Sequence, residues 1–226
     1  MNHAIVALNR LDEEKFERVF EHKVVNDSKT KAILYKQNNG NFNIYALLAI
    51  KHKKVIASTV ALSLVELEQF KINFEGWISK KYGFDVEDKY KEYNSHIVFM
   101  DARNDLVLEE LSEEQDRVLL WLDEKIQLLL NSSYLNTVYD NILHFKFTDF
   151  PTYSLSLDLL VCSAVLLSIK GLNIELSTDE LLVLYNKIKK ESNSGRVGMS
   201  KSLMLLEFAN TKYSNKNIDF ISSVFL

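Results

Sequence analysis

The chain has 226 residues, of which 47% are apolar and 11% aromatic, and this composition excludes an intrinsically disordered protein. The formal net charge is only −4, so no global field would hold the chain on nucleic acid or on an anionic membrane surface. The single cysteine, Cys162, excludes an internal disulfide framework and a zinc site built from paired cysteines.

Two apolar stretches bear on where the protein resides. Residues 1–10 have no basic start and only a short apolar stretch, unlike a secretory signal. The longest apolar run, residues 155–169, is shorter than the roughly 20 residues that a bilayer span requires. We therefore expect a cytoplasmic protein that does not associate with a membrane.

The first part of the chain predicts both helices and strands. One proline and six glycines in the whole sequence leave few tight turns, so helices are expected to dominate. Residues 11–22 have helical spacing behind an acidic first turn, which predicts a short helix. Residues 31–67 carry β-branched segments and a turn at 37–41, which predicts a hairpin or a small sheet. A helical stripe over 64–78 follows, and residues 96–100 are typical of one buried strand.

The strongest helix signal begins at a capping box. Ser112 and Gln115 have the spacing at which each side chain satisfies the other residue's backbone N–H, so we expect a helix over 112–131. Its apolar stripe leaves further apolar residues outside the core face, namely Leu120, Trp121 and Leu128. This helix is therefore expected to contact neighbours on two sides.

The only proline, Pro151, marks the predicted domain boundary. Residues 1–150 are expected to form a mainly helical N-terminal region with a small sheet. Residues 151–226 are expected to form a winged-helix-like C-terminal module. The predicted fold class is thus mainly α with a small β component.

Four predicted elements define the C-terminal module. An apolar helix closes at Gly171, and a second helix opens with a capping box between Ser177 and Glu180. A third helix begins near Ser200, and the run 218–221 is predicted to be a final strand. Three helices followed by β structure is the order of a winged-helix-like module.

No segment has the spacing of a catalytic, cofactor or metal site. The segment 195–202 approaches the phosphate-loop pattern, but it lacks the second glycine and a preceding buried strand. The five histidines are scattered along the chain, and Cys162 lies within an apolar helix. The chain is therefore expected to be non-catalytic.

The C-terminal module contains basic residues suited to nucleic-acid contact and apolar residues suited to protein contact. Non-specific contact with DNA is assigned to the basic residues around its central turn, which are Lys187, Lys189, Lys190, Arg196 and Lys201. The third helix displays few side chains that could read base edges, so packing against a protein is favoured. The candidate partner interface comprises Leu120, Trp121, Leu128, Leu205 and Phe208.

The helix order and apolar spacing of the C-terminal third resemble the middle component of bacterial ABC-three-component systems, which include the Lamassu defence systems. The resemblance covers the apolar helix 157–170, the helix 176–189, the helix 199–210 and the run 218–220. It implies a non-catalytic adaptor subunit of an anti-phage or anti-plasmid defence complex. That subunit would bridge an ATPase similar to the structural-maintenance-of-chromosomes proteins and an effector nuclease.

Two other functions remain open from the residues alone. The acidic stretch 101–124 could cover a basic toxin surface, as an immunity protein does. The acidic residues between Asp85 and Glu110 could instead hold the metal ion of a nuclease.

Overall fold

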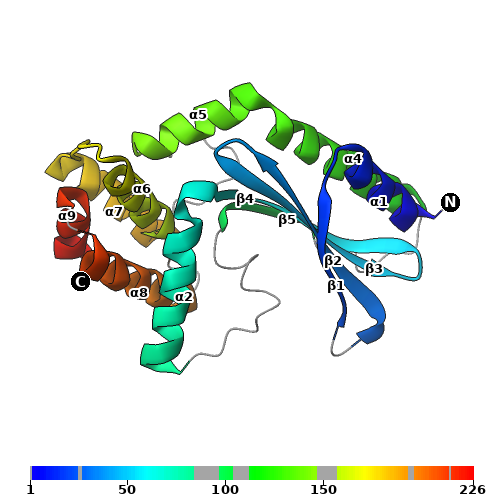
Figure 1. Cartoon of the computed structure of the whole chain (residues 1–226), viewed down its shortest axis with the longest axis horizontal. Helices are drawn as coiled ribbons and strands as arrows, with labels where there is room; N and C mark the ends of the chain where they lie inside the picture. Colours follow the sequence, from blue (N-terminus) through cyan, green and yellow to red (C-terminus); the bar gives the residue numbers. More distant parts are fainter. Residues whose placement is uncertain are drawn as a thin grey trace. The chain divides into compact units, whose positions relative to one another are not determined.

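The structure, a computed structural model, is mainly helical with one sheet, as the sequence predicts (Figure 1). It describes residues 2–24, 27–83, 97–103, 112–146, 157–192, 196–213 and 215–226. The chain divides into two compact units, each built from two stretches of sequence. Unit 1 comprises Met1–Val65 and Phe99–Leu135, and unit 2 comprises Glu66–Val98 and Asn136–Leu226.

These units do not coincide with the predicted division at Pro151. Residues 147–156, where that boundary falls, lie outside the described part of the chain. The helix at residues 68–82 precedes the predicted boundary, yet it packs against a helix near the C-terminus and belongs to unit 2. The division therefore follows contacts between distant segments, which local composition does not reveal.

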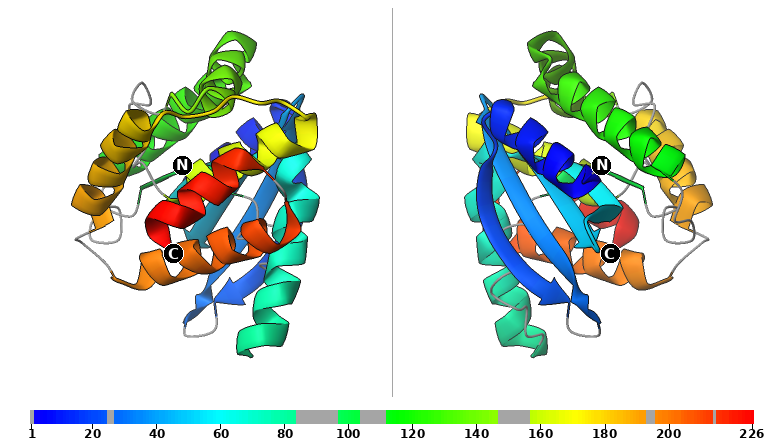
Figure 2. Two further views of the ribbon diagram at one scale, coloured as in Figure 1. Left: turned by 90° about the vertical axis from the view of Figure 1, so that its left-hand side faces the viewer. Right: turned by 90° about the vertical axis from the view of Figure 1, so that its right-hand side faces the viewer.

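Unit 1 is a sheet covered by two helices (Figure 2, right). Its elements are α1 (His3–Glu13), β1 (Glu17–Val24), β2 (Asp27–Asn39), β3 (Phe42–Lys51), β4 (Lys54–Leu64) and α4 (Ser112–Leu130). The five-stranded sheet has the order β1-β2-β3-β4-β5, with antiparallel pairing from β1 to β4. Strand β5 (Ile97–Arg103) includes residues 97–100 of the strand predicted at 96–100, and residue 96 lies outside the described part of the chain. Helices α1 and α4 pack on each other and on β4.

The short helix predicted over 11–22 is wrong. Helix α1 ends at Glu13, because Lys15 adopts a left-handed conformation with φ of 65° and Phe16 N–H bonds to Leu11 C=O at 2.9 Å. The following residues enter β1, where they pair with β2. Pairing with a partner strand thus overrides the helical spacing of the apolar residues.

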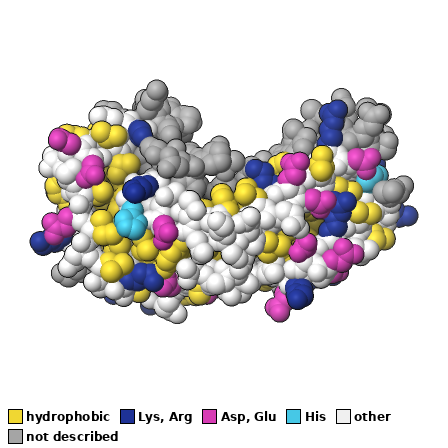
Figure 3. Space-filling view, turned by 90° about the horizontal axis from the view of Figure 1, so that it is seen from above, with side chains coloured by type: hydrophobic (Ala, Val, Ile, Leu, Met, Phe, Trp, Pro, Cys, Tyr) yellow, Lys and Arg dark blue, Asp and Glu magenta, His cyan; other side chains and the backbone are white. Residues whose placement is uncertain are grey.

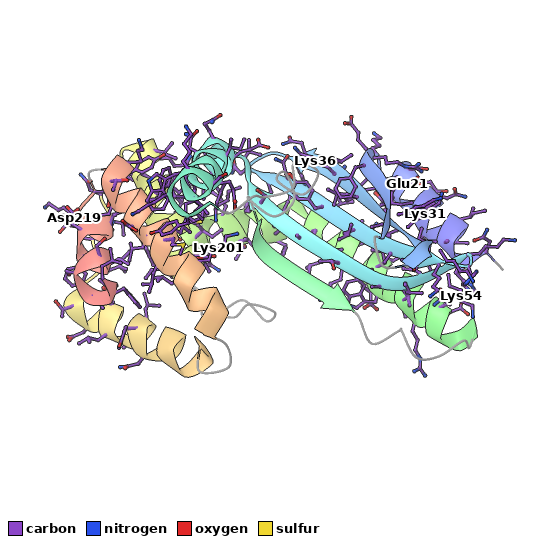
Figure 4. The ribbon with its side chains drawn as sticks, turned by 90° about the horizontal axis from the view of Figure 1, so that it is seen from below. Glu21, Lys31, Lys36, Lys54, Lys201 and Asp219 are labelled. Atoms are coloured by element: carbon purple, nitrogen blue, oxygen red, sulfur yellow. The ribbon has the colours of Figure 1, made fainter. Side chains whose placement is uncertain are left out.

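Strand pairing shortens the turn predicted at 37–41 to residues 40–41, because residues 37–39 continue β2, and it extends the predicted sheet. Asn39 pairs with Phe42, which leaves Gly40 and Asn41 as a two-residue turn, and Gly40 has φ of 65°. Ion pairing supports the neighbouring strands: Glu21 on β1 lies 2.7 Å from the Lys31 ammonium on β2 (Figure 4). The β-branched segments therefore form consecutive antiparallel hairpins.

The β3–β4 turn offers a test of backbone strain. His52 and Lys53 occupy its two central positions with φ of 49° and 66°, a conformation that disfavours residues with a Cβ atom. Replacing them together by Asn and Gly is expected to raise the free energy of unfolding by about 1–2 kcal/mol. Urea unfolding followed by circular dichroism measures this change. The single substitution Lys53→Ala, which keeps the Cβ atom, should leave the midpoint almost unchanged, and a midpoint lowered by Asn-Gly would contradict the turn geometry.

Unit 2 is a helical assembly (Figure 2, left). Its elements are η1 (Val65–Leu67), α2 (Glu68–Tyr82), α5 (Ser132–Leu143), α6 (Leu157–Lys170), α7 (Thr178–Ser192), α8 (Arg196–Lys212) and α9 (Lys216–Phe225). The division between the units falls within two of these elements, so unit 2 includes η1 from Glu66 onward and α5 from Asn136 onward. Helix α6 packs on α8 and α9, while α2 and α7 each pack on α8. Ten residues of α6 are buried, which makes this helix the centre of the unit 2 core. No described helix has the length and apolarity that a membrane span requires.

The final strand predicted at 218–221 is also wrong. These residues lie in α9, where the Asn215 side chain accepts a hydrogen bond from Asn217 N–H at 2.8 Å and caps the helix. Ile218 and Ile221 are both fully buried, which fits the helical spacing of three residues. The described residues after 103 contain no strand, so the winged-helix-like module is not confirmed.

The two predicted capping boxes have different outcomes. Ser177 N–H donates to Glu180 Oε2 at 2.8 Å and Glu180 N–H donates to Ser177 Oγ at 3.3 Å, which confirms the start of α7. These hydrogen bonds, first that from the Ser177 backbone, also lower the pKa of Glu180. The predicted partner of Ser112 does not act as a cap: the Gln115 side chain bonds instead to the backbone of Val55. Helix α4 nevertheless occupies the predicted range.

Candidate binding groove

An open groove of about 610 Å³ lies between α2 and α8 within unit 2. Helix α2 contributes Ile72, Asn73, Gly76, Trp77 and Lys80 to its lining. The C-terminal part of α8 and the residue after it contribute Phe208, Lys212 and Tyr213. The groove thus combines side chains that are more than 100 positions apart in the sequence.

An aromatic cluster forms the base of the groove. The Phe208 ring centroid lies 5.5 Å from that of Trp77, 5.6 Å from that of Phe70 and 5.7 Å from that of Phe74. Tyr213 adds an edge contact with Phe70 at 5.6 Å. Tilted and edge contacts at these separations are the favoured arrangements of aromatic rings. The cluster therefore fixes α2 against α8 and gives the groove a firm apolar base.

Gly76 keeps the α2 side of the groove open. A glycine inside a helix costs about 0.5–1 kcal/mol relative to alanine. A Cβ atom built at Gly76 would meet no heavy atom within 4 Å, so packing does not require the glycine. One turn earlier, the Ile72 side chain is 49% exposed. The α2 wall thus presents an apolar side chain beside open space.

The charges around the groove are mainly positive. Lys81 donates to Glu207 Oε1 at 2.5 Å, Tyr82 donates to Glu207 Oε2 at 3.3 Å, and both contacts join α2 to α8. The hydrogen bond between Lys81 and Glu207 raises the pKa of Lys81 and lowers that of Glu207. Among the described lining residues, Lys80 and Lys212 are the charged ones, and no carboxylate, histidine or thiol is present. The lining therefore suits binding of an anionic, partly apolar ligand.

A buried charged cluster lies on the other side of α2. Lys71 and Glu75 are only 6% and 5% exposed, and the Lys201 ammonium of α8 lies 3.3 Å from Glu75 Oε1 (Figure 4). Lys71 also interacts with the buried Cys162 thiol and with Asp158, both on α6. This cluster joins three helices of unit 2 through charged groups, and it is not part of the groove lining.

Burial and charge act in opposite directions on the pKa of Lys71. Burial lowers this pKa, but the interactions with Cys162, Asp158 and Glu75 outweigh burial and raise it above its ordinary value. Burial also raises the pKa of the Cys162 thiol. The raised pKa of Lys71 favours its ammonium form at neutral pH, and the raised pKa of Cys162 disfavours the thiolate that a nucleophile requires.

The structure corrects part of the predicted partner interface. Leu205 and Phe208 are only 1% and 2% exposed, because α2 and α6 cover that face of α8; of the two, only Phe208 lines the groove, where it keeps a small accessible area at the base. Leu120 and Leu128 on α4 are 59% and 36% exposed, and Trp121 is half-buried. Seen from above, hydrophobic side chains form small groups between charges of both signs (Figure 3). The exposed part of the predicted interface is therefore confined to α4.

The predicted nucleic-acid residues are only partly described. Lys187 on α7 and Lys201 on α8 are exposed, and Lys201 forms the ion pair with Glu75. Lys189, Lys190 and Arg196 lie in α7 and α8, but their side chains are outside the described part of the structure. The described residues therefore do not bring the five basic side chains together as one surface.

The acidic segments behind the two alternative functions lie largely outside the described residues. These are residues 84–96 and 104–111, together with the side chains of 97–103 and 112–114. Among the described residues, no group of three or more histidine, cysteine or acidic side chains could hold a metal ion. The described residues therefore supply no site for either the nuclease or the immunity interpretation.

The groove itself was not predicted from the sequence. Phe70, Phe74 and Trp77 have helical spacing, which indicates an apolar face but not the helix that would cover it. The open position at Gly76 has no local signal of this role. Comparison with known proteins gives no further guide, since no family model, curated protein or solved structure matches the chain.

Proposed function

We propose that this chain is a non-catalytic adaptor subunit that binds two protein partners, one on each compact unit. The observation that carries this proposal is that helices of both units expose large apolar side chains. In unit 1 these are Leu120 and Leu128 on α4, and in unit 2 Ile72 borders the groove. An apolar centre surrounded by a polar rim is typical of the surfaces that proteins use to bind one another.

The resemblance of residues 157–220 supplies the identity of the proposed partners. They would be an ATPase similar to the structural-maintenance-of-chromosomes proteins and an effector nuclease, in an anti-phage or anti-plasmid defence complex in the cytoplasm. The order of α6, α7 and α8 also fits the three helices of a winged-helix-like module. In that arrangement the exposed Lys187 would contribute non-specific contact with DNA.

Co-expression with the products of neighbouring genes tests the adaptor proposal. The double variant Leu120→Glu, Leu128→Glu should lose one partner, with affinity reduced about 30-fold for a loss of ~2 kcal/mol, and keep the other. Ile72→Glu should show the reverse pattern. Ile5→Glu places the same charge at another exposed apolar position and should retain both partners.

One outcome would reject this function, and another would show that the variants are misfolded. A monodisperse chain that co-purifies with neither neighbouring product has no adaptor role. Loss of both partners in every variant, including Ile5→Glu, would indicate damage to the fold instead of two separate surfaces. Circular dichroism of each purified variant distinguishes damage to the fold from loss of contact.

A further inference from the structure

We infer that the groove between α2 and α8 binds an acidic segment of a protein partner, which inserts one bulky apolar side chain beside Gly76. This inference rests on the proposed function, because it names the chemistry of the partner that unit 2 would bind.

The shape of the groove fits a single large side chain. Its volume of about 610 Å³ exceeds that of one amino-acid side chain and leaves room for the adjoining backbone. Phe208 and Trp77 supply an apolar base, and the exposed Ile72 supplies one edge. The position next to Gly76 is open, because a Cβ atom there would meet nothing within 4 Å. A bulky apolar side chain would fill this space and remove the exposed apolar surface from water.

The charges of the groove select an acidic partner. Lys80 and Lys212 are exposed, line the groove, and form no ion pair with any described residue. The neighbouring Lys81 differs, because Glu207 neutralises it. Asn73 accepts a hydrogen bond from Gln69 at 3.0 Å, which leaves its amide N–H groups to donate to a carbonyl or carboxylate. Two uncompensated lysines in a chain of net charge −4 form a local positive site.

The aromatic rings favour a protein segment over single-stranded nucleic acid. Bases bind such grooves by stacking on exposed aromatic faces. Phe208 is only 2% exposed, Phe74 stacks on Trp77, and the Lys81 ammonium lies 4.7 Å from the Trp77 ring centroid. The ring faces of Trp77 are therefore occupied within unit 2. Two lysines would also neutralise few phosphates, whereas an apolar side chain gains from burial against this base.

Selection from a displayed library of random 12-residue peptides on the full chain tests this inference. Enriched peptides are expected to carry several Asp or Glu residues around one Phe, Leu, Met or Trp. Gly76→Leu fills the open position with a good helix former and should weaken the selected peptides at least about tenfold. Gly76→Ala, with its smaller side chain, is the matched control and should keep most of the binding.

Charge reversal provides a second variant that does not alter the apolar base. The double variant Lys80→Glu, Lys212→Glu changes two exposed side chains and should shift selection from acidic to basic peptides while the apolar residue is retained. The Trp121→Phe background leaves Trp77 as the only tryptophan, so its fluorescence reports directly on occupation of the groove. A selected peptide should change this emission in the parent and not in Gly76→Leu.

Several results would overturn the inference. These are no enrichment, enrichment without acidic residues, or binding that Gly76→Leu leaves unchanged. Binding of a labelled 12-nucleotide oligothymidylate that Gly76→Leu abolishes would assign the groove to nucleic acid. Acidic peptides selected by a chain that co-purifies with no neighbouring product would reject the adaptor role alone. If no peptide is selected and Gly76→Leu still co-purifies with both partners, the inference about the groove is rejected while the adaptor role stands.

Discussion

Replacing Lys71 with methionine is expected to lower the free energy of unfolding by about 3–5 kcal/mol. Methionine is close to lysine in size and fits an apolar site, so packing is largely preserved. The substitution removes the ammonium that compensates Asp158 and Glu75, and it leaves those carboxylates in a core where Glu75 is only 5% exposed. Removing one member of a buried charged cluster destabilises strongly, because Asp158 loses this cation and Glu75 keeps only Lys201.

The pH dependence of this effect follows from the raised pKa of Lys71. Its ordinary value is 10.5, and the folded state holds the proton more tightly than the unfolded state. The stabilisation is therefore complete below pH 10.5 and is lost as pH rises through the higher folded pKa. The difference in stability between the parent and Lys71→Met should be constant from neutral pH to about 9 and shrink in more alkaline solution. Burial also raises the pKa of Cys162 above 9.0, and Lys71 partly offsets this rise in the parent, so Cys162 adds its own alkaline loss of stability to both proteins.

Urea unfolding followed by circular dichroism measures the Lys71 effect, and Cys162 supplies a second readout. This thiol is 1% exposed and is the only cysteine, so a thiol reagent reaches it through opening of unit 2. Its labelling rate should rise about 100-fold for a loss of ~3 kcal/mol. Lys80→Met is the matched control on the same helix, because Lys80 is exposed, and it should change stability by less than about 0.5 kcal/mol. Equal stability of Lys71→Met and the parent would show that the ammonium does not compensate buried charge.

The sequence predicted the ends of those helices that are fixed by residues a few positions away in the chain. The capping box of Ser177 with Glu180 and the left-handed Gly171 define ends of α7 and α6 through contacts within a few positions. Two short apolar runs were assigned to the wrong element. Residues 16–20 and 218–221 each satisfy both helical and strand patterns over such a length. Pairing with β2 decided the first run, and burial of Ile218 and Ile221 in unit 2 decided the second.

The groove depends on contacts that no local pattern contains. The sequence predicts Leu205 and Phe208 on α8 as part of a partner interface. In the structure α2, which lies more than 100 residues earlier in the chain, covers that face of α8. One signal of the buried cluster was present in the sequence. Lys71 and Glu75 are four positions apart, and they fall on the apolar face that Phe70, Phe74 and Ile78 define. Charged residues on such a face indicate a paired site in the core.

Gln115→Leu is expected to lower the free energy of unfolding by about 3 kcal/mol. Gln115 is 2% exposed, and its side chain makes two hydrogen bonds with the fully buried Val55 at the start of β4. Oε1 accepts from Val55 N–H at 2.9 Å, and Nε2 donates to Val55 C=O at 3.0 Å. The amide therefore acts as a neighbouring strand would. Leucine is similar in size but leaves both backbone groups buried and unpaired, at about 1–3 kcal/mol each.

A second glutamine and a second substitution at Gln115 separate this hydrogen bonding from packing. Gln127 lies on the same helix, is exposed and bonds to Glu14, so Gln127→Leu should change stability by less than about 0.5 kcal/mol. Gln115→Glu keeps the size of the side chain, but at neutral pH its carboxylate would oppose Val55 C=O with no proton to donate. Because protonation restores a donor, this variant should gain stability relative to the parent as pH falls, whereas Gln115→Leu should not. If urea unfolding shows that the stabilities of Gln115→Glu and Gln115→Leu change with pH in the same way, the Gln115 amide stabilises the fold through its packing volume and not through its hydrogen bonds.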